Sequence, residues 1–318
     1  MPSQPAFPDR LVLARAELDR DHLARAGGLA RLRAEAGARI VVLHEGRMLL
    51  AGERRIALLP AAEVPLADLE LFLGRTTAAA EDAASGAPVI AAVVEDAAAQ
   101  LLGRSRTWGG LRELGALLPA RDAGIFTEAV ALANWHASSG FSPRTGRPTE
   151  PGLSGWVRTE ADPATGASAE FYPRTDAAII VGVVDADDRL LLGSNALWPA
   201  GRFSLLAGFV EPGESLEAAV EREVFEESGI RVADPRYLGS QPWPFPASLM
   251  VGFTARVAEG ASTRTRPDGD EIRELQWFTR EELTAAVAAG RLRLPGETSI
   301  ARAIIAEWHG GDLGPSTW

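Results

Sequence analysis

Residues 208–230, with the sequence GFVEPGESLEAAVEREVFEESGI, decide the fold prediction. A glycine-containing loop leads to Ser215, which can cap a helix over residues 216–228, and Gly229 can end that helix. Apolar residues recur at helical spacing along this helix. One of its faces is therefore expected to pack on a sheet.

Three glutamates of this helix stand at positions i, i+3 and i+4: Glu223, Glu226 and Glu227. This spacing places their carboxylates on one ridge, where like charges repel and the dipole at the helix C-terminus opposes them further. A hard divalent cation, Mg²⁺ or Mn²⁺, takes oxygen ligands and would relieve the repulsion. For the helix taken alone, a solvated acidic face is the simpler interpretation.

The loop and helix together resemble the signature of the Nudix hydrolase family at every fixed position, from Gly208 and Glu214 to Gly229-Ile230. The resemblance implies an α+β fold, the Nudix α/β/α sandwich with a mixed sheet. It also implies metal-dependent hydrolysis of a nucleoside diphosphate linked to another group. In that reaction water attacks a pyrophosphate phosphorus while cations neutralise charge on the phosphate oxygens.

The family resemblance assigns roles to the acidic ridge and its neighbours. Glu223 and Glu227 are implied metal ligands, and Glu226 is a further ligand or activates the water. Arg222 orients the carboxylates, and the Ala207 carbonyl completes the coordination.

The family resemblance implies a further acidic residue, which binds the metal or positions the water, in the segment DEIRELQWF, residues 270–278. Glu271 stands at the matching position of the family. Asp270 and Glu274 compete with it, because the preceding loop, residues 263–269, differs from the family in length.

A second motif, SQPWPFPAS, spans residues 240–248. Its three alternating prolines stiffen an extended strip, and Trp243 and Phe245 add aromatic surface on which a flat base can stack. Taken alone, it could be a proline-rich loop with buried aromatic side chains. Directly after a Nudix signature, it is similar to the hallmark of the NAD(H) diphosphatase subfamily. That resemblance implies cleavage of NAD(H) to nicotinamide mononucleotide and AMP, with removal of NAD caps from RNA as a related activity.

The subfamily resemblance also assigns substrate-binding residues. Phe209 and Tyr172 are expected to contact the nucleotide rings, and Ala301 to lie against the base. The residues expected to bound the pocket are Gln241, Pro242, Trp243, Pro244, Phe245, Pro246 and Ser248. Two alternatives stay open: a Nudix hydrolase of another nucleoside diphosphate derivative such as ADP-ribose, and a non-catalytic nucleotide sensor.

The two halves of the chain contain similar strand–turn–strand patterns, over residues 39–51 and 179–192, which suggests a duplicated fold. Any two hairpins share some of this likeness. Helices are predicted over residues 124–136, 279–289 and 298–308. The predicted domains are a degenerate Nudix-like domain (1–137), a zinc-ribbon-like linker (138–172) and a catalytic Nudix domain (173–318).

Members of the subfamily usually carry a four-cysteine zinc ribbon between the two domains, whereas this chain has no cysteine. The cysteine positions would fall on Ser142 and Thr145 and near Ala164 and Ala167. Hydroxyl and methyl groups cannot replace thiolates on zinc, so no zinc is expected. The segment should form a metal-free hairpin held by proline rigidity and by packing of its aromatic residues, Phe141, Trp156 and Phe171.

Composition narrows the remaining classes of function. The chain of 318 residues has 43 acidic and 32 basic side chains and a net charge of -11, which argues against extended nucleic-acid contacts. It contains no lysine, which excludes P-loop and Schiff-base lysine chemistry. No apolar run reaches the length of a membrane span and no signal-peptide layout is present, so a cytoplasmic location is expected. The subfamily resemblance implies a homodimer.

Overall fold

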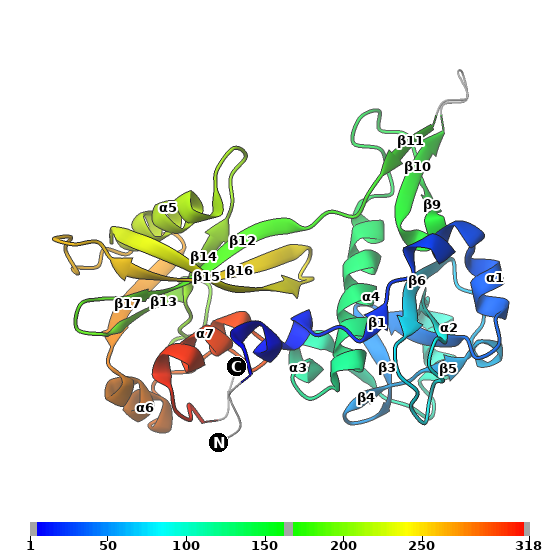
Figure 1. The fold of residues 1–318 in the computed structure, drawn as a ribbon, viewed down its shortest axis with the longest axis horizontal. Helices are drawn as coiled ribbons and strands as arrows, with labels where there is room; N and C mark the ends of the chain where they lie inside the picture. The colour runs from blue at the N-terminus through cyan, green and yellow to red at the C-terminus, as the bar shows by residue number, and fades with distance from the viewer. Residues whose placement is uncertain (1–4, 162–167, 315–318) are drawn as a thin grey trace. The chain divides into compact units, whose positions relative to one another are not determined.

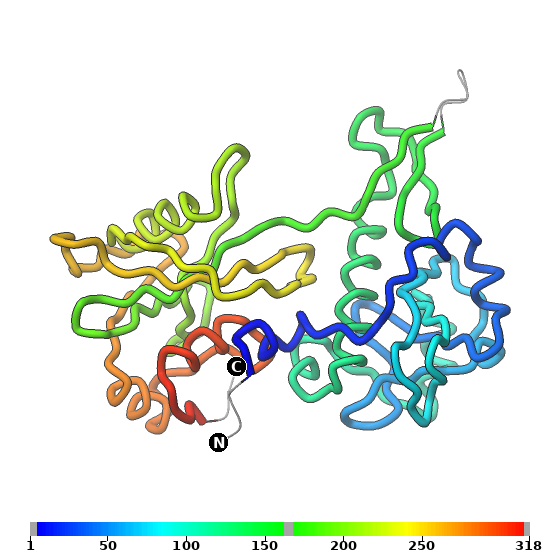
Figure 2. The backbone as a smooth tube through the Cα atoms, in the orientation of Figure 1, coloured from blue at the N-terminus to red at the C-terminus, as the bar shows by residue number. Residues whose placement is uncertain are grey.

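The computed structural model describes residues 5–161 and 168–314. These residues form two compact units (Figures 1 and 2). The first unit comprises Met1–Ala14, Asp176–Pro242 and Ser248–Trp318, and the second comprises Arg15–Thr175 and Trp243–Ala247. Residues 138–172, predicted as a separate linker, belong to the second unit, and the three-part division of the chain stays a prediction.

The first unit is built on a mixed sheet with strand order β15-β16-β12-β13-β17, and β14 pairs with β12 outside this path. The strands are β12 (Asp176–Val184), β13 (Leu190–Asn195), β14 (Leu206–Phe209), β15 (Val232–Trp243), β16 (Ser248–Val257) and β17 (Ile272–Phe278). β12 runs parallel to β16 and antiparallel to β13 and β14. The predicted hairpin over 179–192 is the β12–β13 pair, and the predicted mixed sheet is confirmed.

Helices cover both faces of this sheet (Figure 1). They are α5 (Leu216–Ser228), α6 (Arg280–Ala288) and α7 (Ile300–His309). Side chains alternate along β12, so Ile179 and Val181 pack in the core under α5 while Ile180 and Val184 pack in the core with α6 and α7. The N-terminal turn η1 (Phe7–Arg10) lies beside α7, as the blue and red tubes in Figure 2 show. The predicted α/β/α sandwich is confirmed.

Local sequence signals fix the ends of these helices. The Ser215 hydroxyl accepts a hydrogen bond from the Ala218 N–H at 3.1 Å, and Gly229 ends α5 with a φ of 72°. The Thr279 and Glu282 side chains form the reciprocal capping box that starts α6. Both helix starts lie where the sequence predicts them.

The second unit contains a sheet of eight strands in the order β1-β6-β7-β2-β3-β4, with β5 on β2 and β8 on β3. These strands are β1 (Leu18–Asp19), β2 (Arg39–His44), β3 (Arg47–Gly52), β4 (Arg55–Ile56), β5 (Leu59–Pro60), β6 (Leu69–Thr76), β7 (Pro88–Val93) and β8 (Trp108–Gly110). Its α-helices are α1 (Leu29–Ala34), α2 (Asp96–Leu102), α3 (Leu111–Leu114) and α4 (Ala120–Ser138). Short turns η2 (Val12–Ala14) and η3 (His22–Gly27) complete the N-terminal segment of the chain.

Strand pairing in the second unit repeats that of the first. β2 is parallel to β7 and antiparallel to β3 and β5, as β12 is to β16 and to β13 and β14. β3 pairs with β8 as β13 pairs with β17. The duplication suggested by the two hairpins is therefore present in the pairing of both sheets.

One element breaks the correspondence. The first unit places α5 between β14 and β15, whereas the equivalent connection from β5 to β6, described over its whole length, contains only the 3-10 turn η4 (Ala61–Glu63). The second unit thus keeps the sheet of the duplicated fold without its acidic helix.

The ribbon-like segment forms a three-stranded sheet, β11-β10-β9, with β9 (Glu150–Gly152), β10 (Val157–Ala161) and β11 (Ser168–Phe171), and η5 (Leu153–Gly155) between β9 and β10. Ser142 accepts hydrogen bonds at its hydroxyl from the Arg144 and Thr145 N–H groups. The Thr145 hydroxyl donates to Glu160 Oε1 at 2.6 Å, and Arg147 Nη1 lies 3.8 Å from the same oxygen. The positions at which the subfamily's second cysteine pair would fall, near Ala164 and Ala167, lie outside the described residues.

A second buried network anchors this segment to α4. Arg158 donates from Nη1 to His136 Nδ1 at 2.9 Å and from Nε to the Thr149 hydroxyl at 2.7 Å. Because His136 Nδ1 accepts, its Nε2 carries the proton and donates to the Gly155 carbonyl at 2.8 Å. Burial lowers the pKa of His136, so the ring stays neutral in this role.

The prediction that aromatic packing holds the ribbon is wrong for Phe141, whose side chain is 67% exposed. Trp156 does anchor the segment: its Nε1 donates to the Phe72 carbonyl at 2.7 Å, and the Arg25 guanidinium lies 3.5 Å from its ring centre. Phe171 is half-buried, 5.8 Å from Arg144. Charged and hydroxyl groups, rather than the aromatic trio, make most of the specific contacts here.

Candidate functional site

Arg222 is the centre of a network that fixes the acidic side chains of α5. Its Nε and Nη2 donate to the two carboxylate oxygens of Glu214, each at 2.8 Å. Its Nη1 donates to Glu223 Oε1 at 2.8 Å and to Glu226 Oε2 at 3.0 Å, and Nη2 reaches the Phe209 carbonyl at 2.9 Å. The hydrogen bonds from Arg222 lower the pKa of Glu214 to about 2. This geometry supports the orienting role predicted for Arg222.

Gly208 allows the Glu223 carboxylate to lie against β14. A Cβ atom at position 208 would come within 2.0–2.2 Å of all three carboxylate atoms of Glu223. Any side chain here would push that carboxylate away. Gly208, the first glycine of the motif, is therefore needed so that the Glu223 carboxylate can approach the backbone of β14, and not because its backbone angles are unusual.

Glu227 is the most buried carboxylate of the ridge, with 5% of its surface exposed. Its Oε2 is buried without a hydrogen-bond partner. Burial, together with the charges of Glu223, Glu271 and Asp268, raises the pKa of Glu227 to about 8, and a backbone hydrogen bond from Ala207 opposes this rise only in part. A buried, unpartnered carboxylate oxygen is costly unless a cation or a proton neutralises it.

Glu271 contributes charge to the same place. Its carboxylate raises the pKa of both Glu223 and Glu227, although burial is the larger cause in each case. Glu274, by contrast, lines a separate hollow with Phe203. Glu271, rather than Glu274, is thus shown to act on the acidic ridge, and the choice among Asp270, Glu271 and Glu274 as the metal ligand stays a prediction.

Asp268 is an acidic residue of the site that the sequence reasoning missed. It adds to the negative charge around Glu227. Its Oδ1 accepts hydrogen bonds from the N–H groups of Asp270, Glu271 and Ile272, at 3.1, 3.2 and 2.8 Å. Asp268 therefore shapes the turn that carries Glu271. The Asp268-Gly269 pair is a turn signal that could have drawn attention to this position.

The donor set of this acidic cluster fits a hard divalent cation. It consists of carboxylates, one of them with an unpartnered buried oxygen, next to the backbone of β14. The assignment of Ala207, Glu223, Glu226, Glu227 and Glu271 as the residues that hold the ion stays a prediction.

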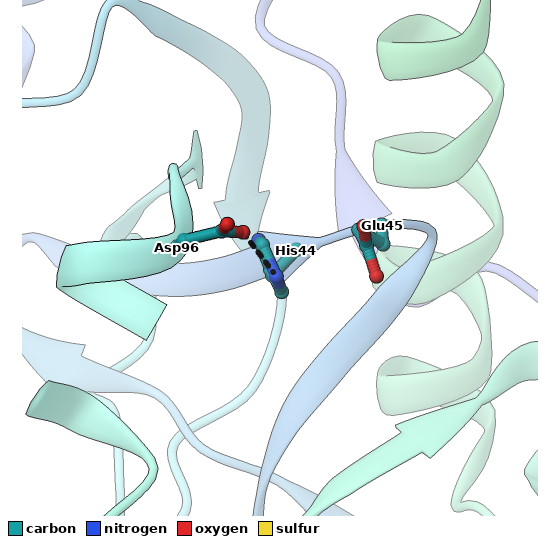
Figure 3. A group of neighbouring side chains, drawn as sticks. All are labelled: His44, Glu45 and Asp96. Carbon is teal, nitrogen blue, oxygen red and sulfur yellow. Dashed lines mark ion pairs between the residues drawn. The ribbon is translucent and has the colours of Figure 1, made fainter. Parts of the chain in front are cut away.

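A second group of possible metal ligands lies in the second unit (Figure 3). The candidate ligand atoms of His44, Glu45 and Asp96 lie within 4.8 Å of one another, a spacing met by no other such group in the described part of the chain. His44 Nδ1 donates to the Val94 carbonyl at 2.9 Å, and its Nε2 lies 3.4 Å from Asp96 Oδ1. Both carboxylates are exposed, and Arg104 lines the same hollow as His44 and Asp96, so we assign no metal to this surface group.

Comparisons with known proteins agree with the geometry. Residues 173–297 match the family described as NUDIX domain, and residues 37–135 match the NADH pyrophosphatase-like rudimentary NUDIX domain. The chain is 42% identical over 289 residues to the Mycobacterium tuberculosis protein named NAD-capped RNA hydrolase NudC, covering 88% of this chain and 86% of that protein. The chain belongs to the NADH pyrophosphatase branch of the Nudix hydrolases. The human NAD-capped RNA hydrolase NUDT12 is 36% identical over 199 residues, which cover 60% of this chain and 42% of that protein.

In this Nudix hydrolase, α5 is the helix of the Nudix signature, and the second unit contains the rudimentary domain that lacks a counterpart of it. The described residues contain no helix long and apolar enough to cross a membrane.

The predicted substrate-binding residues differ in how much surface they offer. Phe209 and Tyr172 are 59% and 63% exposed, and the Tyr172 hydroxyl donates to Glu170. Gln241 is 1% exposed, with its amide bonded to the Leu13 N–H and the Thr298 carbonyl.

Two further residues that are predicted to contact the substrate are buried. Ala301 packs in the core with 1% exposure, and Ser248 is also buried. Neither offers much surface to a base, whereas Phe209 does. Their assignment to substrate binding stays a prediction.

Replacing Gly208 by alanine is expected to lower turnover by about tenfold to a hundredfold, because the new methyl group displaces the Glu223 carboxylate and misplacements of about 1 Å cost this much. Gly296→Ala is the matched control, since a Cβ there meets no atom within 4 Å and its φ is not positive. Steady-state rates and melting temperatures of the two variants make the comparison. Equal rates for both would contradict the close-approach role of Gly208.

The raised pKa of Glu227 predicts a pH dependence of metal binding. Between its ordinary value of 4.5 and about 8, the metal-free folded protein keeps a proton that the unfolded chain releases. The contribution of protonated Glu227 to the free energy of unfolding is therefore complete below about pH 4.5, and it is lost as the pH rises to about 8. A cation must displace that proton, so Mg²⁺ affinity should rise up to about tenfold per pH unit until about pH 8. Calorimetric titration across this range measures it, and a flat profile would argue against the assignment.

Proposed function

We propose that this protein hydrolyses the pyrophosphate bond of NAD(H), giving nicotinamide mononucleotide and AMP, with Mg²⁺ or Mn²⁺ as cofactor. The observation that carries the proposal is the buried carboxylate of Glu227, whose Oε2 has no hydrogen-bond partner and whose pKa is raised by the charges of Glu223 and Glu271 as well as by burial. The intact SQPWPFPAS strip supports NAD(H) over other nucleoside diphosphate derivatives.

The residues of α5 divide the work. Glu223 and Glu227, with Glu271 and the Ala207 carbonyl, would hold the divalent cation, whose charge neutralises the pyrophosphate oxygens. Arg222 holds Glu223 and Glu226 in place through hydrogen bonds of 2.8 and 3.0 Å.

Glu226 is the more exposed carboxylate of the ridge, since 56% of its side chain is accessible. It is the group best placed to take a proton from the attacking water or to serve as an outer ligand. In this proposal the buried carboxylates would bind the cation and the exposed carboxylate of Glu226 would face the reacting water.

Removal of NAD caps from RNA is the second activity of this site that we propose. It is favoured by the names of the relatives from Mycobacterium tuberculosis and human, both called NAD-capped RNA hydrolases. The reaction is the same hydrolysis, with the RNA chain attached to the AMP side. The net charge of -11 means that such a substrate would be held mainly at its 5′ end.

One experiment separates these candidates. The purified protein is incubated with Mg²⁺ or Mn²⁺ and, in separate reactions, NADH, NAD⁺, ADP-ribose and NAD-capped RNA, and the products are identified by mass spectrometry. Reduced nicotinamide mononucleotide from NADH, or nicotinamide mononucleotide from NAD⁺ or from the RNA, supports the proposal. Cleavage of ADP-ribose alone would favour the broader Nudix activity, and binding without turnover of any compound would favour a sensor.

The assembly and location are part of the same proposal. We propose a cytoplasmic homodimer, which the subfamily resemblance supports. Sedimentation equilibrium of the full chain tests the dimer, and a monomer at micromolar concentration would contradict it.

A further inference from the structure

The tip of the β15–β16 hairpin, residues 243–247, carries the aromatic part of the SQPWPFPAS strip and belongs by its contacts to the second unit. Trp243 and Phe245 pack against each other, with ring centres 5.0 Å apart and planes at 70°. Two helices of the second unit, α3 and α4, contribute the side chains that contact this tip.

Arg112 of α3 lies over this aromatic pair. Its guanidinium carbon is 4.0 Å from the centre of the Phe245 ring and 5.3 Å from the centre of the Trp243 ring. A planar guanidinium attracts the electron-rich face of an aromatic ring, an interaction worth about 0.5–1 kcal/mol at exposed sites. Arg112 is therefore placed to keep the two rings in one arrangement.

Asn134 of α4 holds the backbone of the same tip. Its Nδ2 donates to the Pro244 carbonyl at 2.9 Å and to the Pro246 carbonyl at 3.3 Å. Prolines carry no N–H, and the Phe245 N–H is used on the Trp243 carbonyl at 2.7 Å. The tip has few donors of its own, so the side-chain amide of Asn134 supplies the two hydrogen bonds that its carbonyls need.

We infer that Arg112 and Asn134 are positioning residues that fix the aromatic strip in the conformation used for substrate recognition. This inference rests on the proposed function, in which the strip contacts the substrate. It gives the rudimentary domain, which lacks the acidic helix, a specific task in the reaction: it supplies one cation and one amide that order the strip. Neither residue touches the reacting atoms.

The test uses variants that keep size and change one property. Asn134→Asp removes both donors and is nearly isosteric, and Arg112→Lys keeps the charge and removes the planar group. Matched controls are Gln100→Glu, an exposed amide on α2, and Arg106→Lys, whose partner is Glu63 at 3.8 Å. All are made in the full chain and measured with NADH and Mg²⁺.

For Asn134→Asp we expect the KM for NADH to rise about fivefold and kcat to stay within about twofold, because two hydrogen bonds of modest net strength are lost. Arg112→Lys should raise KM about two- to threefold. The controls should match the unaltered protein. Unchanged KM in both variants, or a fall in kcat that simply follows a lower melting temperature, would overturn the inference.

Hydrogen exchange followed by mass spectrometry gives a readout without substrate. In both variants the peptide that spans residues 240–250 should exchange about tenfold faster, while peptides of α4 away from position 134 keep their rates. Equal exchange in this peptide would overturn the inference, even in a protein that hydrolyses NADH. If the unaltered protein cleaves no NAD(H), the proposed function fails, whereas faster exchange in the variants would still show that these residues order the strip.

Discussion

Glu227→Gln is expected to reduce turnover of NAD(H) by about 10²–10³-fold, because it removes the carboxylate that is most completely buried in the acidic cluster. Glutamine has nearly the same volume, so the packing of α5 is kept. The substitution also removes a buried like charge. The metal-free variant should therefore melt at a higher temperature than the unaltered protein above about pH 8, where Glu227 would otherwise be ionised.

Glu227→Gln should lower turnover but raise the melting temperature of the metal-free protein, and these opposite signs make the test specific. A residue that merely supports the fold would lose stability and activity together. Glu221→Gln, an exposed position on the same helix, is the control and should change neither. Near-normal turnover of Glu227→Gln at saturating Mg²⁺ would show that the ion is held elsewhere.

Arg222→Lys is expected to lower turnover by about 10–100-fold and the stability by about 1–3 kcal/mol, since lysine cannot reproduce the fork of donors that arginine offers. In the present arrangement the guanidinium serves Glu214, Glu223 and Glu226 at once. An ammonium group can satisfy one or two of these carboxylates, and the others are left to repel each other.

Arg236→Lys provides the comparison, because Arg236 pairs with Asp234 on an exposed surface. Rates and urea unfolding curves for the two variants can be measured side by side. A lysine at position 222 that leaves both quantities unchanged would mean that the carboxylates are oriented by their own packing.

Local signals explain why α5 and its surroundings could be predicted from the sequence. Its cap at Ser215, its end at Gly229 and its buried face all depend on residues within one turn of where they act. The capping box that starts α6 could be predicted from the sequence for the same reason. In the second half of the chain, the mixed sheet followed from the same family pattern.

Contacts distant in sequence were not predictable in this way. The position of Glu271 depends on the turn that Asp268 orders through hydrogen bonds to the Glu271 and Ile272 N–H groups, and the sequence alone does not show the shape of that turn. Phe141 is exposed although it is apolar, and the buried carboxylate of Glu160 accepts a hydrogen bond from Thr145; hydrophobicity alone predicts neither. Asn134 contacts residues 243–247 across about 110 residues of sequence, and no local sequence pattern predicts this contact.

The ribbon segment has a consequence for the chemistry the protein can tolerate. Thiolates on zinc are open to oxidation and depend on the metal supply, whereas Thr145, Glu160 and Arg147 hold their contact through groups that oxidants leave intact. With no cysteine anywhere in the chain, peroxide has no thiol to attack. The contacts of Thr145, Arg147 and Glu160 therefore need neither a thiol nor a zinc ion.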